Sequence, residues 1–376
     1  MKRRWNKRLV FLLIVLLALA IREIVLERGP FFLRPGLHMH AYVTNTADGT
    51  VSVIDLVKVA TIATVPVGPS PSGVRAHPKR DEIWGVSSDG GYVWVLDARK
   101  NQVVGRIPVG PGAYALDFSR DGKRVLVAAS ASGMVTEIDA MTRQILARGR
   151  AGRRPWIAKF TPDGKMVVVT NRDDATVSLL DPVTLATLVV VPVAPQPEQI
   201  AILPDGSKAF VSSGGSSAVS VINLRERALL ANVMLGGSAA SLIVKPDGGE
   251  LYVPSPDVHG LVILNTSTDE VADFLLLGMS PTRGVLTADA QSLYIVDSAA
   301  GRVMPINIAN RQVAPPIPVG QGPRACAFTP GEAESLLLVV NGDSNDLAVI
   351  RTRGTPSLIT LIPVGQHPRD LAIKVF

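Results

Sequence analysis

One short motif recurs along this chain at a nearly constant interval, and it constrains the fold more than any other feature. A β-like segment ends in a Pro-Val-Gly-type turn eight times, and the turn residues are Gly68, Gly110, Gly152, Ala194, Gly236, Gly278, Gly320 and Gly365. The first seven copies are 42 residues apart, and the last follows after 45. A repeat of this length indicates stacked copies of one supersecondary unit.

The first copy shows what each unit contains. Its expected strands are residues 42–45, 51–55, 60–67 and 73–78. All four are short, rich in Val and Ile, and bounded by Gly, Pro, Asp or Asn, as strands joined by turns usually are. No segment beyond the N-terminus sustains a helical apolar period. Four antiparallel strands in about 40 residues predict an all-β chain built of β-propeller blades.

The count of strands by type predicts eight blades and a closed ring. The strand type that begins at Tyr42 occurs eight times, and so does the strand that follows each turn. The last strand of the second type, residues 370–376, ends the chain, whereas no such strand precedes Tyr42. The C-terminal strand is therefore expected to complete the first blade, which removes two exposed sheet edges. Seven blades are the alternative, if one divergent copy is not a full blade.

The repeat resembles that of the YVTN family of β-propeller proteins. The family consensus joins a Tyr-Val-Thr-Asn strand, a Val-Ser-Val-Ile-Asp strand and an Ile-Pro-Val-Gly turn, and residues 42–45, 51–55 and 107–110 match these elements. The resemblance covers residues 41–376 and implies a propeller that serves as a surface or periplasmic binding protein. Related propellers occur in quinoprotein dehydrogenases, haem d1 proteins and sugar lactonases, so the resemblance leaves the activity open.

The first 21 residues differ in kind from the repeats. Five basic residues among the first eight precede an uncharged run from Leu9 to Ile21. These thirteen residues would span about 20 Å as a helix, less than the roughly 30 Å core of a bilayer. The small residues Ala18 and Ala20 favour a cleaved signal peptide, and a membrane anchor is the alternative. Either segment would place the propeller in the periplasm or at the cell surface, with residues 22–40 as a linker.

The net charge of +6 comes largely from this leader. Without its five basic residues, 33 of the 38 Lys and Arg residues remain, against 32 Asp and Glu. The repeat region is therefore nearly neutral, and its charge gives no argument for nucleic-acid binding. The single cysteine, Cys326, cannot form an intrachain disulfide and is expected to be a small buried side chain.

Residues that break the repeat near the predicted channel are the candidates for ligand binding. Loops that lead into the innermost strands should surround one mouth of the channel. The fourth residue after each turn residue is expected there, namely Ser72, Tyr114, Trp156, Glu198, Ala240, Thr282, Arg324 and Arg369. Arg283 and Asp370 follow one place further along. This variation suits a ligand-binding surface, and ordinary solvated loop side chains are the alternative.

A second charged set occupies the seventh position after the turn. It consists of Arg75, Asp117 and Lys159, in three successive blades. Charges on an innermost strand need partners or water, so we expect a chain of ion pairs between blades, with a binding patch as the alternative. Arg75 and Lys159, together with Arg324 and Arg369, would form a channel mouth that attracts anions.

Two further residues interrupt the strand pattern. Glu137 replaces an apolar residue and is expected to pair with a nearby base such as Lys159 or Arg143. Pro305 cannot donate to a strand ladder, so its strand is expected to be bulged.

Motifs for metal binding and catalysis are sparse. His38 and His40 form one His-x-His pair in the predicted linker, and the sequence has no Gly-x-Ser-x-Gly elbow and no P-loop. A lactonase-like site would need several inward carboxylates, and a quinoprotein an aromatic floor, usually with vicinal cysteines. No cofactor or metal is therefore predicted.

The first hypothesis for function is a non-catalytic exported protein that binds another extracytoplasmic protein or a small anion. A cofactor-handling or redox protein of the quinoprotein or haem d1 kind, or a lactonase-like hydrolase, is the alternative.

Overall fold

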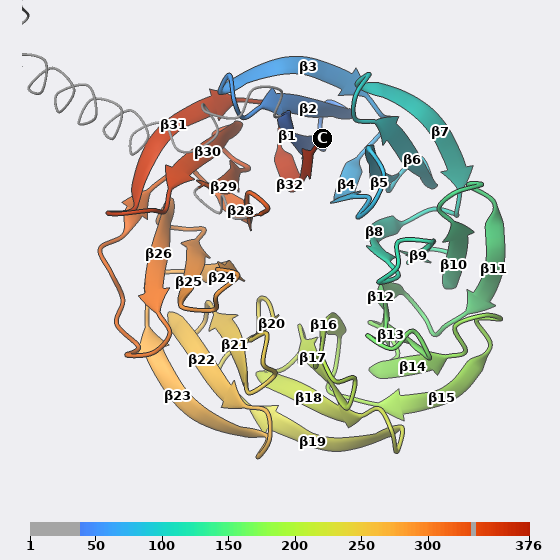
Figure 1. Cartoon of the computed structure of the whole chain (residues 1–376). Helices are drawn as coiled ribbons and strands as arrows, with labels where there is room; N and C mark the ends of the chain where they lie inside the picture. The colour runs from blue at the N-terminus through green and yellow to red at the C-terminus, as the bar shows by residue number, and fades with distance from the viewer. Residues whose placement is uncertain (1–37, 332–335) are drawn as a thin grey trace, which may run out of the picture.

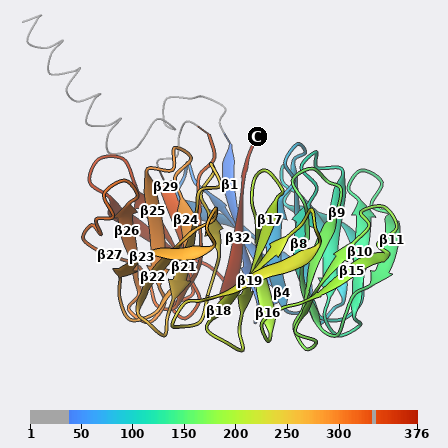
Figure 2. The same ribbon diagram turned by 90° about the horizontal axis from the view of Figure 1, so that it is seen from below.

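The computed structural model describes residues 38–331 and 336–376, which form a closed ring of eight four-stranded antiparallel sheets (Figure 1). The sheets are the blades of a propeller, and Figure 2 shows the same ring edge-on. The predicted eight-bladed, all-β architecture is confirmed. No helix long and apolar enough to span a membrane occurs in the described part of the chain. The predicted leader at residues 1–21 lies outside the described residues, as does the predicted linker up to residue 37.

Each blade has an innermost and a second strand that are four to eight residues long in most copies. The innermost strands, in ring order, are β32 (Pro368–Val375), β4 (Pro71–Ala76), β8 (Ala113–Phe118), β12 (Pro155–Phe160), β16 (Pro197–Ile202), β20 (Ile243–Val244), β24 (Pro281–Leu286) and β28 (Pro323–Phe328). The second strands are β1 (Met39–Asn45), β5 (Glu82–Ser87), β9 (Arg124–Ala129), β13 (Val167–Asn171), β17 (Lys208–Ser213), β21 (Glu250–Ser255), β25 (Ser292–Asp297) and β29 (Leu336–Asn341).

The third and outermost strands complete each sheet. The third strands are β2 (Thr50–Asp55), β6 (Tyr92–Asp97), β10 (Met134–Asp139), β14 (Thr176–Leu180), β18 (Ala218–Asn223), β22 (Gly260–Asn265), β26 (Arg302–Asn307) and β30 (Asp346–Arg351). The outermost strands are β3 (Ala60–Pro66), β7 (Gln102–Pro108), β11 (Ile145–Arg150), β15 (Thr187–Pro192), β19 (Ala228–Met234), β23 (Glu270–Leu276), β27 (Ile317–Pro318) and β31 (Ser357–Pro363).

The ring closes where β32 pairs with β1. Their register runs from Met39 opposite Val375 to Val43 opposite Leu371. At the end of this pair, the amide of Phe376 donates to the carbonyl of His38 at 2.9 Å. The strand β1 begins at Met39, so His40 is a strand residue that is 7% exposed, within the range predicted as linker.

The hydrophobic core lies between blades. Second and third strands are buried along almost their whole length, whereas outermost strands such as β7 and β19 alternate between exposed and half-buried side chains. A typical cluster joins Met39 and Ile54 of the first blade to Leu338 and Val349 of the last. Each blade therefore needs its neighbours to bury its apolar faces, as in other repeat folds.

The polar half of the Tyr-Val-Thr-Asn motif connects strands and blades. Thr44 accepts a hydrogen bond from the amide of Asp370 in its own blade at 3.1 Å and donates to the carbonyl of Ser72 in the next blade at 3.0 Å. Asn45 donates to the hydroxyls of Thr50 and Ser52, both at 2.9 Å. These buried contacts hold the entry to each innermost strand in place.

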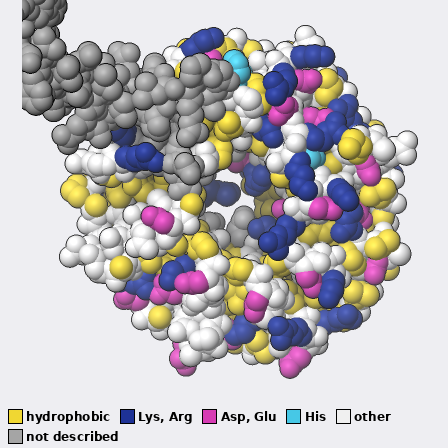
Figure 3. Space-filling view, viewed as in Figure 1, with side chains coloured by type: hydrophobic (Ala, Val, Ile, Leu, Met, Phe, Trp, Pro, Cys, Tyr) yellow, Lys and Arg dark blue, Asp and Glu magenta, His cyan; other side chains and the backbone are white. Residues whose placement is uncertain are grey.

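The connections define two faces of the ring. The face that holds the hairpins between second and third strands, and the entries to the innermost strands, is here called the mouth face. The opposite face carries residues 38 and 376 and is here called the terminal face. Figure 3 views the ring along the channel, which is open at the centre and has Lys and Arg side chains at its wall.

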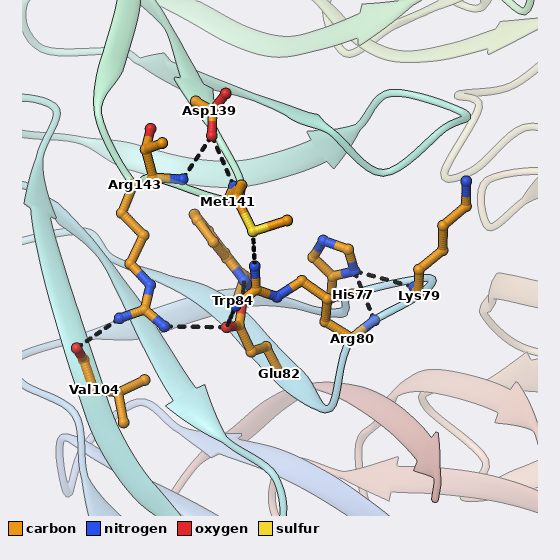
Figure 4. A network of polar contacts seen from close by, with 10 residues as sticks. His77, Lys79, Arg80, Glu82, Trp84, Val104, Asp139, Met141 and Arg143 are labelled. Carbon is orange, nitrogen blue, oxygen red and sulfur yellow. Dashed lines mark hydrogen bonds and ion pairs between the residues drawn. The ribbon is translucent and has the colours of Figure 1, made fainter.

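Charged residues tie neighbouring blades together on the terminal face. Glu82 accepts hydrogen bonds from Arg80 at 2.7 Å, from Arg143 of the next blade at 3.0 Å and from the indole of Trp84 at 3.0 Å (Figure 4). The same inter-blade arrangement joins Glu250 to Arg311. Lys208 and Asp269 repeat it with the opposite polarity at 2.7 Å.

Glu137 does pair with a base, but with neither Lys159 nor Arg143, and the bulge expected at Pro305 is absent. Glu137 pairs with Arg124 at 2.9 Å, because the adjacent strand β9 brings that guanidinium to a diagonal position. Pro305 lies in an unshifted ladder with β25, so β26 is not bulged. Its carbonyl accepts from Ala314 on the outer side, which shows that the missing amide also faces outward. The outermost strand β27 is accordingly reduced to two residues.

Candidate functional site

The innermost strands are bulged where they enter the channel. Between Pro71 and Val74 one extra residue lies opposite β5, and the same shift occurs between Ala113 and Leu116 and between Pro155 and Ala158. The residues in each bulge are the fourth and fifth after the turn residue. A bulge re-aims side chains locally, and here it directs these residues to the channel and its mouth.

Four of the predicted site residues surround one cavity on the mouth face. This cavity has a volume of about 480 Å³, and it is lined by Tyr114, Arg283, Arg324, Arg369 and by smaller residues that include Ala240 and Thr282. It is here called the vestibule. Asp343, from the hairpin between β29 and β30, also lines it. The sequence analysis did not single out Asp343.

Positive charge exceeds negative charge in the vestibule. Arg324 forms an ion pair with Asp343 at 2.8 Å. Arg369 donates to the neutral hydroxyl of Tyr114 at 3.0 Å. Among residues 38–331 and 336–376, no carboxylate lies within ion-pair distance of Arg283 or Arg369. Three guanidinium groups therefore face one carboxylate.

Two aromatic residues contact arginines at the mouth, and one of these arginines, Arg369, lines the vestibule. Tyr114 and Trp156 stack with their ring centres 4.4 Å apart. Arg369 lies over Tyr114, 4.9 Å from the ring centre, and Arg172 and Arg154 lie over Trp156 at 5.7 and 6.0 Å. Each ring thus has a ring on one side and a guanidinium group on another. We conclude that this pair positions arginines and leaves little free ring face for stacking a ligand.

Glu198 lies beside this aromatic pair and is already neutralised. Arg172 binds it at 2.9 Å and also donates to Gln196. Arg172 was not among the predicted residues, although a signal existed. The signal is an interval of sixteen residues between the innermost-strand position and the start of the hairpin. Arg172 follows Trp156 by this interval, and Ser88 follows Ser72 by the same interval. The hydroxyls of Ser72 and Ser88 lie 3.0 Å apart, which shows that the two positions meet at the mouth.

Glycines at the same hairpin position make room for long charged side chains. A Cβ atom on Gly342 would lie 2.0 Å from Nε of Arg324. A Cβ atom on Gly214 would lie 2.6 Å from an oxygen of Glu198. Each charged side chain therefore lies directly across the backbone of its own hairpin.

The seventh-position charges line the channel below the vestibule. Arg75 and Asp370 form an ion pair at 2.9 Å. Asp117 accepts from the amide of Phe160 at 3.3 Å, and Lys159 donates to the carbonyl of Ile200 at 2.9 Å, so these two charges bind backbone groups of the next blade. Negative and positive groups thus alternate around half of the wall.

Burial in the channel shifts the pKa values of these groups. Desolvation raises the pKa of Asp117, although Lys159 opposes the shift, and desolvation lowers the pKa of Lys159. The charge of Asp370 raises the pKa of Arg75. Cys326, on the innermost strand of the last blade, is half-buried, and burial raises the pKa of its thiol to about 12. This thiol is therefore protonated at neutral pH.

A smaller cavity lies in the channel directly beneath the vestibule. It has a volume of about 70 Å³, and residues that line it include Gly73, Arg75, Ala115, Ile157, Gln199 and Asp370. It is here called the chamber. Tyr114, Arg283 and Arg369 line both the chamber and the vestibule, so they form the boundary between the two.

Other cavities carry better-paired charges. A groove of about 750 Å³ on the mouth face contains Arg150, Arg153 and Arg154, of which Arg153 pairs with Asp174 and Arg154 with Asp173. A cavity of about 530 Å³ on the terminal face contains the Glu250–Arg311 pair. No group of three or more His, Cys, Asp or Glu residues suited to a metal ion occurs in the described residues. The vestibule and chamber are thus the best candidates for a ligand site.

No protein-family model and no curated protein matches this sequence. Several solved structures share its fold. A hydrazine synthase from Kuenenia stuttgartiensis is 20% identical, with a TM-score of 0.61, over 75% of this chain and 96% of that one. The dihydro-heme d1 dehydrogenase NirN, in complex with DHE, is 18% identical, with a TM-score of 0.74, over 88% of this chain and 74% of that one.

A third structure, AztD from Citrobacter koseri, is 12% identical, with a TM-score of 0.69, over 90% of this chain and 98% of that one. At these identities the likeness concerns the fold alone. The chain therefore shares the β-propeller architecture of all three proteins.

Proposed function

We propose that this chain is an exported, non-catalytic propeller of the YVTN type that binds a small organic anion at Arg283 and Arg369, where the vestibule meets the chamber. The observation that carries the proposal is the pair Arg283 and Arg369, two guanidinium groups without a carboxylate partner among the described residues. An acidic group of another extracytoplasmic protein would bind by the same chemistry.

The electrostatics of the vestibule favour an anion. Like charges gathered in a concave site attract counter-ions, and the field is stronger there than on an open surface. Guanidinium groups present fixed pairs of donors that match carboxylate oxygens. Arg369 uses one nitrogen on Tyr114, and its other nitrogens have no hydrogen-bond partner among the described residues, so they can donate to a ligand.

The arrangement gives binding without an evident catalytic group. Asp343 is engaged by Arg324, and Glu198 by Arg172, so neither carboxylate is placed to act as a general base. The chain would thus hold its ligand reversibly and either deliver it or report its presence to a partner.

Charge reversal at the two unpaired guanidinium groups tests the proposal. Isothermal titration calorimetry would compare the wild-type protein with R283E/R369E, using acetate, succinate and citrate as probes. Affinity for these anions should fall about 100-fold, because one charge-assisted hydrogen bond is worth about 1.5–3 kcal/mol. The matched control R120E/R225E changes the net charge equally at exposed turns of the terminal face. Equal binding by wild type and R283E/R369E would refute the proposal.

A further inference from the structure

We infer that the ligand binds head first, with a carboxylate head group in the chamber and an aliphatic chain in the vestibule. The inference rests on the proposed function and assigns the orientation and chemical class of the ligand. The evidence for it is that Arg283 and Arg369 each line both cavities. A group bound between them lies at the boundary and can extend to either side.

The size of the chamber limits the head group. A volume of about 70 Å³ corresponds to roughly two water molecules. This is enough for a carboxylate and too small for a sugar or an aromatic ring. Adjacent strands approach closely at this wall, because a Cβ atom on Gly73 would lie 2.9 Å from the carbonyl oxygen of Tyr114.

The charges of the chamber favour a single negative charge. Asp370 is engaged by Arg75 at 2.9 Å and by the amide of Val74 at 3.2 Å, so it does not neutralise Arg283 or Arg369. Ile157 and Ala115 make part of the wall apolar. Arg283 and Arg369 are exposed to the channel, so a bound anion would replace water molecules at their donors.

The vestibule favours an aliphatic chain over an aromatic one. Tyr114 is an aromatic residue of its wall, and Arg369 and Trp156 cover the ring of Tyr114. The remaining wall includes the small residues Ala240 and Thr282.

Two alanine-to-leucine variants separate the two compartments. Ala115 lines the chamber alone, and Ala240 lines the vestibule alone. Calorimetry would use acetate, which fits the chamber, and hexanoate, which needs both cavities. A115L should weaken both probes at least tenfold, whereas A240L should weaken hexanoate at least threefold and leave acetate unchanged. Neither substitution removes a charge, so an effect of A115L reports space in the chamber.

The outcomes distinguish this inference from the proposed function. If A115L binds acetate and hexanoate as wild type does while R283E/R369E does not, the head-first orientation is wrong and the anion site stands. If the wild type binds neither probe, both proposals fail. Hexyl phosphate tests the head group. If the wild type binds hexyl phosphate more tightly than hexanoate, and A115L abolishes that binding, the assignment of a carboxylate head group is wrong. Should A115L lower Tm by more than a few degrees, A115V provides the same test with a smaller side chain.

Discussion

At the scale of single residues, the mouth shows how neutral side chains place charged ones. Tyr114 holds Arg369 both by its hydroxyl at 3.0 Å and by its ring face. Its own ring is supported by Trp156. Ser72 of the second blade lies between Arg369 and Tyr114 in the order of the ring. Its side chain is small, and its hydroxyl donates to the carbonyl of Tyr114 at 2.8 Å. Arg369 of the first blade can therefore reach Tyr114 of the third.

Another single residue, His77, makes the stability depend on pH. Its Nδ1 accepts hydrogen bonds from the amides of Lys79 and Arg80, both at 3.0 Å. Burial lowers the pKa of His77 below its usual value of 6.5. Just below pH 6.5 the unfolded chain therefore binds more protons than the folded chain. The contribution of His77 to the free energy of unfolding is complete above that pH and decreases as the pH falls. His40 acts in the same direction, because burial lowers its pKa too.

The variant H77N tests this dependence. An asparagine oxygen can accept the same two amides and does not titrate, as in other turns of this kind. Urea unfolding at pH 7.5 and pH 5.5 should show a smaller loss of stability for H77N than for wild type. The exposed His259 gives the control H259N, which should follow the wild type. An unchanged pH dependence in H77N would assign the effect to other groups.

At the scale of elements, charge pairs on the terminal face connect three blades to the blades that follow them. Glu82 in β5 and Glu250 in β21 occupy equivalent positions and bind an arginine in the turn of the following blade. Lys208 in β17 occupies the same position with its partner Asp269. The geometry thus accepts either polarity, provided that the two charges are opposite.

A double-mutant cycle at this pair tests the idea. K208E alone places two carboxylates together at a site where both side chains are less than one-fifth exposed, and it should cost about 2 kcal/mol of unfolding free energy. K208E/D269R should recover most of that loss, because it reproduces the polarity of Glu250 and Arg311. Urea unfolding gives the four free energies, and a double variant no more stable than K208E would show that polarity is specific to each blade.

At the scale of the whole molecule, the fold depends on closure of the ring. Because the apolar clusters lie between blades, a blade that loses its neighbour exposes core side chains. The pairing of β32 with β1 is the place where the two described ends of the chain meet. That pairing also carries Arg369 and Asp370 to the mouth, so closure and the ligand site share one strand.

Removal of residues 370–376 tests the role of closure. The first blade would lose most of its innermost strand, and we expect a loss of more than about 5 kcal/mol, seen as a large drop in Tm. F376A serves as the control, since it keeps the strand pairing and removes the ring contacts of Phe376 with His38, His40 and Arg99. A truncated protein with unaltered thermal unfolding would mean that the ring does not depend on this strand.

Much of the site could be placed from sequence, but its partners could not. The repeat predicted that Tyr114, Arg324 and Arg369 surround the mouth, because equal positions in equal blades lie on one ring. It did not predict Asp343 or Arg172, which come from hairpins and reach the mouth only through side-chain direction. The expected chain of ion pairs does not form, because Arg75, Asp117 and Lys159 make no ion pair with one another. Arg75 pairs with Asp370 instead, while Asp117 and Lys159 bind backbone groups.

The sequence by itself determined the number of blades, their strand order and the closure of the ring, since a regular repeat of antiparallel strands has few other ways to bury its apolar faces. Only the tertiary structure decided which charges meet across the channel. Those contacts join side chains of different blades, and they depend on bulges and on side-chain conformations that no spacing along the chain encodes. The unpaired state of Arg283 and Arg369, on which the proposed function depends, belongs to that second kind of property.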